Sequence, residues 1–255
     1  MSKRIPVIAA NWKMYKTKDE ALAFVFAVNE SVPPKNKVES IICAPAILLN
    51  LLVKREGDRL RIGGQNMHYK DEGAFTGENS PAQVKTSGAD YILIGHSERR
   101  SYFNETDETV NLKMHAAFKY ELTPILCVGE QLTDRESNMT KQVLDMQLAK
   151  AFEKIDEQKA VKTIVAYEPV WAIGTGKTAT PEMANDTIKE IRKTLAKIYS
   201  QKAADSIRIL YGGSVKPDNI DVLLKESDID GALIGGAALD PNNFLVFTEA
   251  AKNKA

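Results

Sequence analysis

The chain has 255 residues, with 34 Lys and Arg against 34 Asp and Glu, three His and two Cys. This length is too great for a small module and supplies enough chain for one large domain or two modest ones. The zero formal net charge disfavours a nucleic-acid-binding protein, and two cysteines cannot form a disulfide scaffold or a four-cysteine zinc site.

The apolar segments do not have the pattern of a secretion signal or a membrane span. The first apolar stretch ends at Asn11 after a few residues, whereas a signal sequence needs an apolar core of about 7–15. The most apolar later run, 46–53, is interrupted by Asn50 and falls far short of the ~20 residues of a span. Cys43 and Cys127 lie in apolar runs, where we expect buried, reduced thiols. We therefore expect a soluble cytoplasmic protein with neither nucleic acid nor membrane as a partner.

Short runs rich in β-branched residues recur along the chain at intervals of roughly 32 residues, the size of one strand-plus-helix unit. Most of these runs are apolar throughout rather than alternating, which is typical of parallel strands that are covered on both faces. In chain order, the predicted strands are Ile5–Ala10, Val38–Cys43, Leu60–Gly63, Tyr91–Ile94, Pro124–Val128, Thr163–Tyr167, Ile207–Tyr211 and Gly231–Ile234.

Helical patterns with clear start signals lie between the strands. Thr17–Glu20 and Ser80–Gln83 have the capping-box pattern, and Thr180-Pro181 and Asp240-Pro241 place a capping residue before a proline. The segment 181–199 predicts one inward-facing apolar stripe, made of Ile188, Ile191, Leu195 and Ile198.

Eight strand–helix units without a linker or a change in composition favour a closed (β/α)8 barrel of α/β class, with eight parallel strands surrounded by helices. We expect a single domain over residues 1–255. An open doubly wound sheet is the alternative, but it more often has five or six strands and a glycine-rich turn after the first. Here the first strand leads into Asn11, Trp12 and Lys13, with no G-x-G-x-x-G pattern.

A base, an imidazole and a cation follow different predicted strands at their carboxyl ends, where barrels of this class build their active sites. Glu168 follows the sixth strand, His96 the fourth and Lys13 the first. Each residue type alone is common as a structural or solvated group, and we expect that role for His68 and His115. The coincidence of all three at one rim predicts a catalytic site.

Glycine pairs end the last two predicted strands, at Gly212-Gly213 and Gly235-Gly236. They could be simple tight turns. Barrels commonly bind phosphate after strands seven and eight, however, through bare backbone N–H groups. With the hydroxyl of Ser214 nearby, this pattern favours a small phosphorylated substrate.

The loop after Glu168 has the pattern of a lid over the base. Trp171 and Ile173 would form an apolar underside, while Gly174 and Gly176 would let the tip approach a phosphate. Gly176-Lys177-Thr178 also matches the end of a nucleotide-binding P-loop, but the first glycine of that motif is replaced by Trp171.

Four segments together resemble the triosephosphate isomerase family, and the likeness extends from about Pro6 to about Asn243 with no departure at a catalytic position. These segments are Asn11–Lys13, Ile94–Arg100, Ala166–Gly176 and Tyr211–Val215. The resemblance implies a TIM barrel that interconverts dihydroxyacetone phosphate and glyceraldehyde 3-phosphate in glycolysis and gluconeogenesis, without a metal or an organic cofactor. It also implies a homodimer formed through the loop at 66–79, with Thr76-Gly77 near its tip.

The same resemblance assigns roles to individual residues. Glu168 would be the base, His96 would donate a hydrogen bond to the carbonyl oxygen, and Lys13 would offset the charge of the enediolate. The expected substrate-binding residues are Asn11, Lys13, Gly174, Ser214, Gly235 and Gly236, with Ser97 and Glu98 supporting the catalytic groups. Two rivals remain to be tested, a Schiff-base aldolase and a non-catalytic phosphate-metabolite binder.

Overall fold

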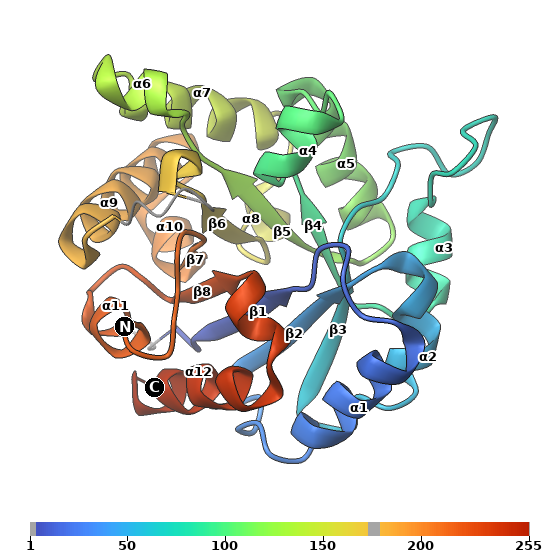
Figure 1. The fold of residues 1–255 in the computed structure, drawn as a ribbon. Helices are drawn as coiled ribbons and strands as arrows, with labels where there is room; N and C mark the ends of the chain where they lie inside the picture. Colours follow the sequence, from blue (N-terminus) through green and yellow to red (C-terminus); the bar gives the residue numbers. More distant parts are fainter. Residues whose placement is uncertain (1–3, 173–178, 255) are drawn as a thin grey trace.

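The computed structural model of the protein describes residues 4–172 and 179–254. Eight parallel strands form a closed barrel in chain order, and β8 pairs with β1 to complete it (Figure 1). The predicted fold class is therefore confirmed. The strands are β1 Val7–Asn11, β2 Glu39–Ala44, β3 Leu60–Gly64, β4 Tyr91–Ile94, β5 Thr123–Val128, β6 Ile164–Tyr167, β7 Arg208–Tyr211 and β8 Gly231–Ile234.

The strand boundaries differ from the predicted ones by two residues at most. The largest difference is at β1, which begins at Val7 rather than Ile5. Pro6 precedes it and has no N–H group to donate to a neighbouring strand, although its carbonyl accepts a hydrogen bond from Glu39 at 2.9 Å. The ladder therefore begins only where Val7 can donate, to the carbonyl of Asp230 at 3.0 Å.

Helices surround the barrel on its outer side (Figure 1). They are α1 Lys18–Val28, α2 Leu49–Val53, α3 Pro81–Thr86, α4 Ser97–Tyr102, α5 Asp107–Lys119, α6 Leu132–Glu136, α7 Thr140–Ala151, α8 Glu157–Ala160, α9 Pro181–Ile198, α10 Gln201–Ser206, α11 Ile220–Lys225 and α12 Pro241–Lys254. Short 3-10 turns cover η1 Ala46–Leu48, η2 Val170–Ala172 and η3 Gly236–Leu239. Among the helices of the described residues, none has the length and apolar character needed to cross a membrane.

The predicted helix starts are confirmed by their hydrogen bonds. Ser80 Oγ accepts from the backbone N–H of Gln83 at 3.2 Å, and the Gln83 side chain accepts from the N–H of Ser80 at 2.8 Å. Thr180 Oγ1 accepts from the N–H of Met183 at 3.2 Å. These bonds satisfy N–H groups that the first helical turn leaves without a partner.

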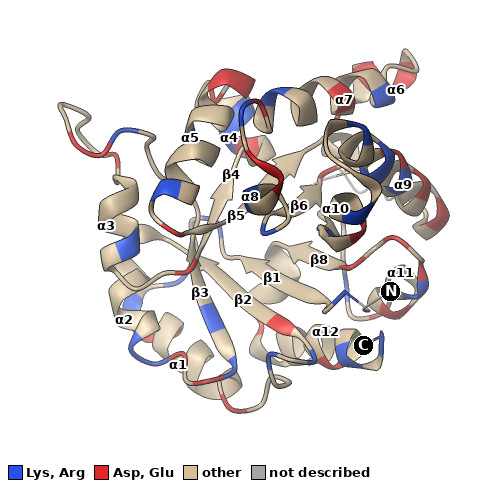
Figure 2. Cartoon of the chain, turned by 180° about the vertical axis from the view of Figure 1, so that it is seen from behind, with Lys and Arg blue, Asp and Glu red and all other residues tan. Residues whose placement is uncertain are grey.

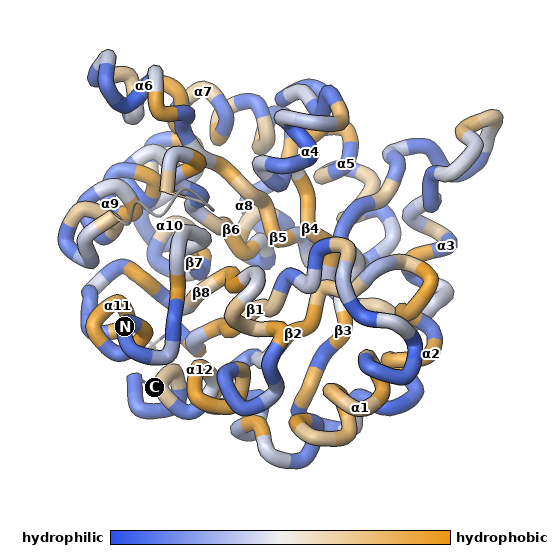
Figure 3. The backbone as a smooth tube through the Cα atoms, viewed as in Figure 1, coloured by the Kyte–Doolittle hydropathy of each residue, from blue (hydrophilic) through white to orange (hydrophobic). Residues whose placement is uncertain are grey.

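Alternate residues of the strands enter two separate cores, as expected for strands covered on both faces. The larger core lies between the barrel and the helices, and a smaller one fills the barrel interior. Figure 3 shows the strands as mostly hydrophobic segments enclosed by more hydrophilic helices and loops. The interior residues include both cysteines, Cys43 and Cys127, which are free and buried as predicted. Burial raises the pKa of the Cys43 thiol to about 12, so it is protonated at neutral pH.

The amino end of the barrel interior carries charged side chains that neutralise one another. Arg208 on β7 forms an ion pair with Glu39 on β2, and Glu39 also accepts a hydrogen bond from the hydroxyl of Tyr91 on β4. Burial, and then the negative charge of Glu39, raise the pKa of Tyr91 above its usual range. Elsewhere the strands carry few charges, and most charged residues lie on the helices and loops (Figure 2).

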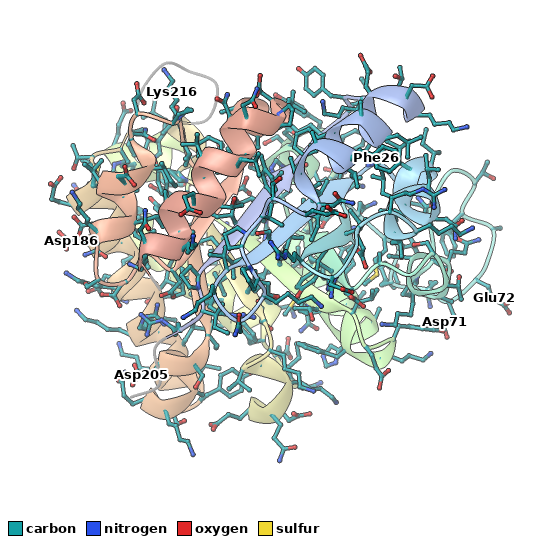
Figure 4. All side chains as sticks on the ribbon, turned by 90° about the horizontal axis from the view of Figure 1, so that it is seen from below. Phe26, Asp71, Glu72, Asp186, Asp205 and Lys216 are labelled. Atoms are coloured by element: carbon teal, nitrogen blue, oxygen red, sulfur yellow. The ribbon has the colours of Figure 1, made fainter. Side chains whose placement is uncertain are left out.

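The loop between β3 and α3 projects away from the barrel (Figure 1), and Asp71 and Glu72 lie at the outer margin of the molecule (Figure 4). Inside this loop, the ring of His68 stacks on Tyr69 and Phe75 with centroids 4.4 and 4.1 Å apart. His68 therefore packs within its own loop, in agreement with the structural role expected for it.

Candidate active site

A cavity of about 290 Å³ opens at the carboxyl end of the barrel. Its walls contain every predicted catalytic residue and every predicted substrate-binding residue except Gly174, which lies outside the described residues together with Ile173 and Gly176. The lining residues are Asn11, Lys13, His96, Glu168, Gly212, Gly213, Ser214, Val215, Lys216, Leu233, Gly235, Gly236 and Ala237. The structure thus brings residues from β1, β4, β6, β7 and β8 to one place.

Glu168 is almost completely buried, with 2% of its surface exposed, directly after β6. Its carboxylate accepts hydrogen bonds from the backbone N–H of Ser97 at 2.9 Å and from the Ser97 hydroxyl at 3.2 Å. Burial raises the pKa of this carboxyl group, but the His96 ring and the two Ser97 donors outweigh burial and lower it. Glu168 is therefore a carboxylate at neutral pH, as a general base must be.

His96 precedes α4 and presents its two ring nitrogens to different partners. Nδ1 accepts a hydrogen bond from the backbone N–H of Glu98 at 3.2 Å, and Nε2 lies 3.0 Å from Oε1 of Glu168. The neutral ring therefore carries its proton on Nε2, which faces the base. Burial lowers the pKa of His96 and the charge of Glu168 raises it, with the raising effects prevailing.

Lys13 reaches the cavity from a strained backbone position. Its φ angle of 51° is in the left-handed region, and its N–H donates to Oδ1 of Asn11 at 3.0 Å. The Gln65 side chain donates to the Lys13 carbonyl at 2.8 Å. The Lys13 ammonium pairs with Oε1 of Glu98 at 2.5 Å. Gln65 follows β3, and its polar type at a strand end is the sequence signal from which this supporting role could have been found.

The glycines of the last two strands leave space beside the catalytic side chains. A Cβ atom on Gly212 would lie 3.0 Å from Cγ of Glu168, and one on Gly235 would lie 3.2 Å from Cε of Lys13. Beside Gly236 there is open space, since a Cβ there would meet no atom within 4 Å. The cavity therefore has bare glycine backbone in its wall, beside Ser214.

Glu130 anchors the start of the loop after β6, a contact that the sequence did not predict. This residue is fully buried, and Oε1 accepts hydrogen bonds from the Trp171 indole at 2.8 Å and from the Tyr167 hydroxyl at 3.1 Å. The guanidinium of Arg135 lies 3.2 Å from the same oxygen and 4.7 Å from the Trp171 ring centre. Trp171 is thus held at the base of the predicted lid, whose tip and whose P-loop-like end at 176–178 lie outside the described residues.

Two further hollows differ from this cavity in their chemistry. One of about 410 Å³ lies beside α11 and α12, where Arg4 pairs with Asp230 at 2.6 Å. The other, of about 450 Å³, shares Asn11, Lys13 and His96 with this cavity but is otherwise bounded by Met14, Phe103 and the loop after β3, without Glu168. The base and the imidazole converge only at the cavity of 290 Å³ among these hollows of the described chain, so it is the candidate active site.

Comparison with known proteins agrees with this geometry. The family model described as triosephosphate isomerase matches residues 6–251. A curated relative named triosephosphate isomerase, from Lactiplantibacillus plantarum, is 50% identical over 243 residues, which are 95% of this chain and 96% of that relative. The chain therefore belongs to the triosephosphate isomerase family.

Proposed function

We propose that this protein is a triosephosphate isomerase, which interconverts dihydroxyacetone phosphate and D-glyceraldehyde 3-phosphate through an enediolate intermediate. The observation that carries the proposal is the convergence of Glu168, His96 and Lys13 on one cavity at the carboxyl end of the barrel. Isomerisation of these sugars requires a base for a carbon-bound proton, a donor for the carbonyl oxygen and a nearby positive charge. The cavity supplies one of each.

The first step is the removal of a proton from the carbon next to the substrate carbonyl. Glu168 takes this proton, and the carbon–hydrogen electron pair moves into the carbon–carbon bond while the carbonyl oxygen becomes the enediolate oxygen. In the structure this carboxylate still binds Ser97 and His96. Glu168 must therefore exchange those donors for the substrate, which makes the carboxylate a stronger base.

The second role, as electrophile, belongs to His96. When the substrate carbonyl replaces Glu168 at Nε2, the negative charge that raises the His96 pKa moves away from the ring. The Glu98 N–H continues to occupy Nδ1 and opposes protonation there. The ring then acts as a neutral donor to the developing oxyanion, a property already known for this family of isomerases. Lys13 offsets the remaining negative charge.

A chain with zero formal net charge has no overall positive field to attract a phosphate, so the proposal assigns phosphate binding to local groups. We propose that Gly235 and Gly236 hold the phosphate through backbone N–H groups, with Ser214 and Gly174 as further donors and Asn11 beside the reacting carbons. The open space next to Gly236 supports this assignment. Closure of the loop that contains Gly174 would exclude water from the enediolate.

A Schiff-base aldolase is the main catalytic rival. It needs a nucleophilic lysine deep on a strand, whereas β6 leads into Glu168, and the Lys13 ammonium is paired with Glu98 at 2.5 Å. Borohydride treatment with substrate would trap a covalent adduct if this rival were correct. A non-catalytic phosphate binder, the second rival, would bind inorganic phosphate without any turnover.

A homodimer through the loop at 66–79 and a cytoplasmic location are further parts of the proposal. Two strongly exposed apolar side chains, Met14 (94%) and Phe103 (63%), line a hollow together with Gly77 and Glu78 of this loop. Such a surface is typical of a contact with another chain. Light scattering would give twice the mass of one chain if the proposal is right, and cell fractionation would test the location.

A coupled assay of triose phosphate turnover tests the function directly. We expect interconversion in both directions in the presence of a chelator, with no added metal or organic cofactor. Glu168→Ala and His96→Ala should each lose most of the activity. Turnover close to wild type in either variant would refute the assignment of that residue.

A further inference from the structure

The side chain of Gln147 on α7 forms a paired contact with the backbone at the end of β5. Its Oε1 accepts a hydrogen bond from the N–H of Gly129 at 2.9 Å, and its Nε2 donates to the Gly129 carbonyl at 3.1 Å. The amide oxygen meets an N–H group and the amide nitrogen meets a carbonyl, so the two bonds fix the orientation of the Gln147 amide. The proposed mechanism does not use this residue.

These two hydrogen bonds take the place of those that β4 would make to Gly129 if β4 extended that far. The register between β4 and β5 ends at Ile94 and Leu126, because β4 turns away at Gly95, where φ is 74°. Just beyond that point the Cys127 carbonyl accepts a hydrogen bond from the Arg100 guanidinium at 3.4 Å, and the next backbone groups on the same side, those of Gly129, lie past the end of β4. Backbone groups there need partners from side chains, and Gln147 provides one donor and one acceptor.

On the opposite side, the same backbone is bonded to the segment that carries the base. The carbonyl of Val128 accepts from the N–H of Glu168 at 2.7 Å, and the carbonyl of Glu130 accepts from the N–H of Val170 at 3.2 Å. Gly129 lies between these two bonds, so its own N–H and C=O face away from β6 and toward Gln147.

Gly129 also touches the backbone of Glu168 directly. A Cβ atom at Gly129 would lie 1.7 Å from the carbonyl oxygen of Glu168 and 3.3 Å from its Cα. The two main chains are therefore in close contact without any intervening side chain, so we expect a shift of the Gly129 peptide to displace the peptide of Glu168.

We propose that Gln147 is a positioning residue for Glu168, acting through Gly129 and never touching the substrate. It holds the end of β5 in place as the missing strand would, so that the base has one fixed backbone position from which its carboxylate can reach the substrate carbon. This inference rests on the proposed function of Glu168 as the base. Small displacements of a catalytic group affect turnover more than substrate affinity.

The first experiment compares Gln147→Met, which keeps the length of the side chain but removes both hydrogen bonds, with Gln142→Met. Gln142 lies on the same helix and is exposed, so its replacement is a matched control. We expect kcat of Gln147→Met to fall roughly tenfold or more, with competitive inhibition by inorganic phosphate changed less than about twofold. Gln142→Met should behave as wild type in both respects.

The second experiment uses Gln147→Glu, whose new carboxyl group can be switched by pH. When protonated, that group offers one donor and one acceptor as the amide does, whereas the carboxylate offers acceptors only and repels the Gly129 carbonyl. Expressed relative to wild type at each pH, kcat of Gln147→Glu should rise as the pH falls from about 8 to about 5. The same ratio for Gln147→Met should stay constant.

The outcomes separate this inference from the proposed function. If wild-type protein does not turn over triose phosphates, the proposed function fails. If wild type is active but kcat of Gln147→Met stays within about twofold of it, the positioning role is wrong. It is also wrong if phosphate inhibition weakens as much as kcat falls, or if the kcat ratio of Gln147→Glu does not respond to pH. Should Gln147→Met fail to fold, the pH response of Gln147→Glu decides alone.

Discussion

The two ends of the barrel interior contain similar chemical groups and use them differently. At the amino end, the carboxylate of Glu39 is held between Arg208 and Tyr91. At the carboxyl end, the carboxylate of Glu168 is bonded to Ser97 and His96 and lines a cavity of about 290 Å³. Both ends therefore contain a carboxylate with hydrogen-bonding partners. Of these two described carboxylates, only that of Glu168 lines a cavity that a substrate could enter.

That space has an identifiable origin in the residues of β7 and β8. Arg208 fills the amino end of β7 with a long side chain, whereas Gly212 follows the same strand at its carboxyl end. A side chain on Gly212 would contact Glu168, and one on Gly235 would contact Lys13. One end is thus filled and held by opposite charges, while the other is kept open.

The largest expected effect comes from removing the base at the carboxyl end. Glu168→Gln keeps the shape but cannot accept a proton, so we expect kcat to fall by about 10³-fold, within the range for loss of a general base. The melting temperature should stay near that of wild type, because the amide still accepts from Ser97. Glu249→Gln, at a 56% exposed side chain, is the control. A small fall in kcat for Glu168→Gln would show that the carboxylate at the carboxyl end is not the catalytic base.

Breaking the ion pair at the amino end should lower the stability of the protein and leave its turnover unchanged. Arg208→Met leaves Glu39 without its cation inside the barrel, and we expect a loss of about 2 kcal/mol in the free energy of unfolding. This figure allows for the partial solvent exposure of both side chains. Urea denaturation measures the loss, with Arg55→Met on the exposed surface as control. kcat per folded molecule should remain near wild type, and a matching loss of kcat would contradict the comparison.

A pH effect of intermediate size is expected from Glu56, in the loop that enters β3 at the amino end. Burial, and then the charge of Asp90, raise the pKa of Glu56 to about 7. The guanidinium of Arg61 lies 3.6 Å from the carboxylate, and its positive charge acts in the opposite direction. A raised carboxyl pKa favours the folded state while the group is protonated, and this contribution disappears as the pH rises through about 7.

Glu56→Gln should therefore stabilise the protein at pH 8 by about 1–2 kcal/mol and change little at pH 4, where the wild-type carboxyl is protonated in both states. Thermal or urea unfolding at the two pH values measures the difference. Equal effects at both values would show that the Glu56 carboxyl does not titrate in this range.

The smallest expected effect concerns the donors that hold the base. Ser97→Ala removes the hydroxyl donor to Glu168 but keeps the backbone N–H, so the pKa of the base should rise. The acidic limb of kcat/KM, which reports the free enzyme, should move to higher pH by about half a unit. Ser87→Ala, remote from the cavity, should leave the profile unchanged. An unshifted limb in Ser97→Ala would mean that its hydroxyl does not act on Glu168.

The strands and the helix starts could be predicted from the sequence, because short local patterns determine them. Continuous apolar runs gave all eight strands, because both faces of each strand are covered, and the order of strand ends placed Glu168, His96 and Lys13 together. Cap residues such as Ser80 located helix starts, because their side chains act within a few residues of chain.

Contacts between distant residues could not be read in the same way. Arg208 and Glu39 are 169 positions apart, and only the closed barrel brings their strands across from one another. Nor did any local pattern connect Gln147 with Gly129, since the need for that amide arises only where β4 leaves the sheet. The alternation of inward and outward residues along β2 and β7 could have shown that Glu39 and Arg208 both point into the barrel.

Lys13 shows how an active site can oppose the stability of its own fold. Its left-handed backbone favours glycine or asparagine, at a cost of roughly 1 kcal/mol for other residues. Glycine and asparagine, which suit this conformation best, carry no positive charge. Under the proposed function, Lys13→Gly would relieve the backbone but would remove the positive charge that offsets the enediolate.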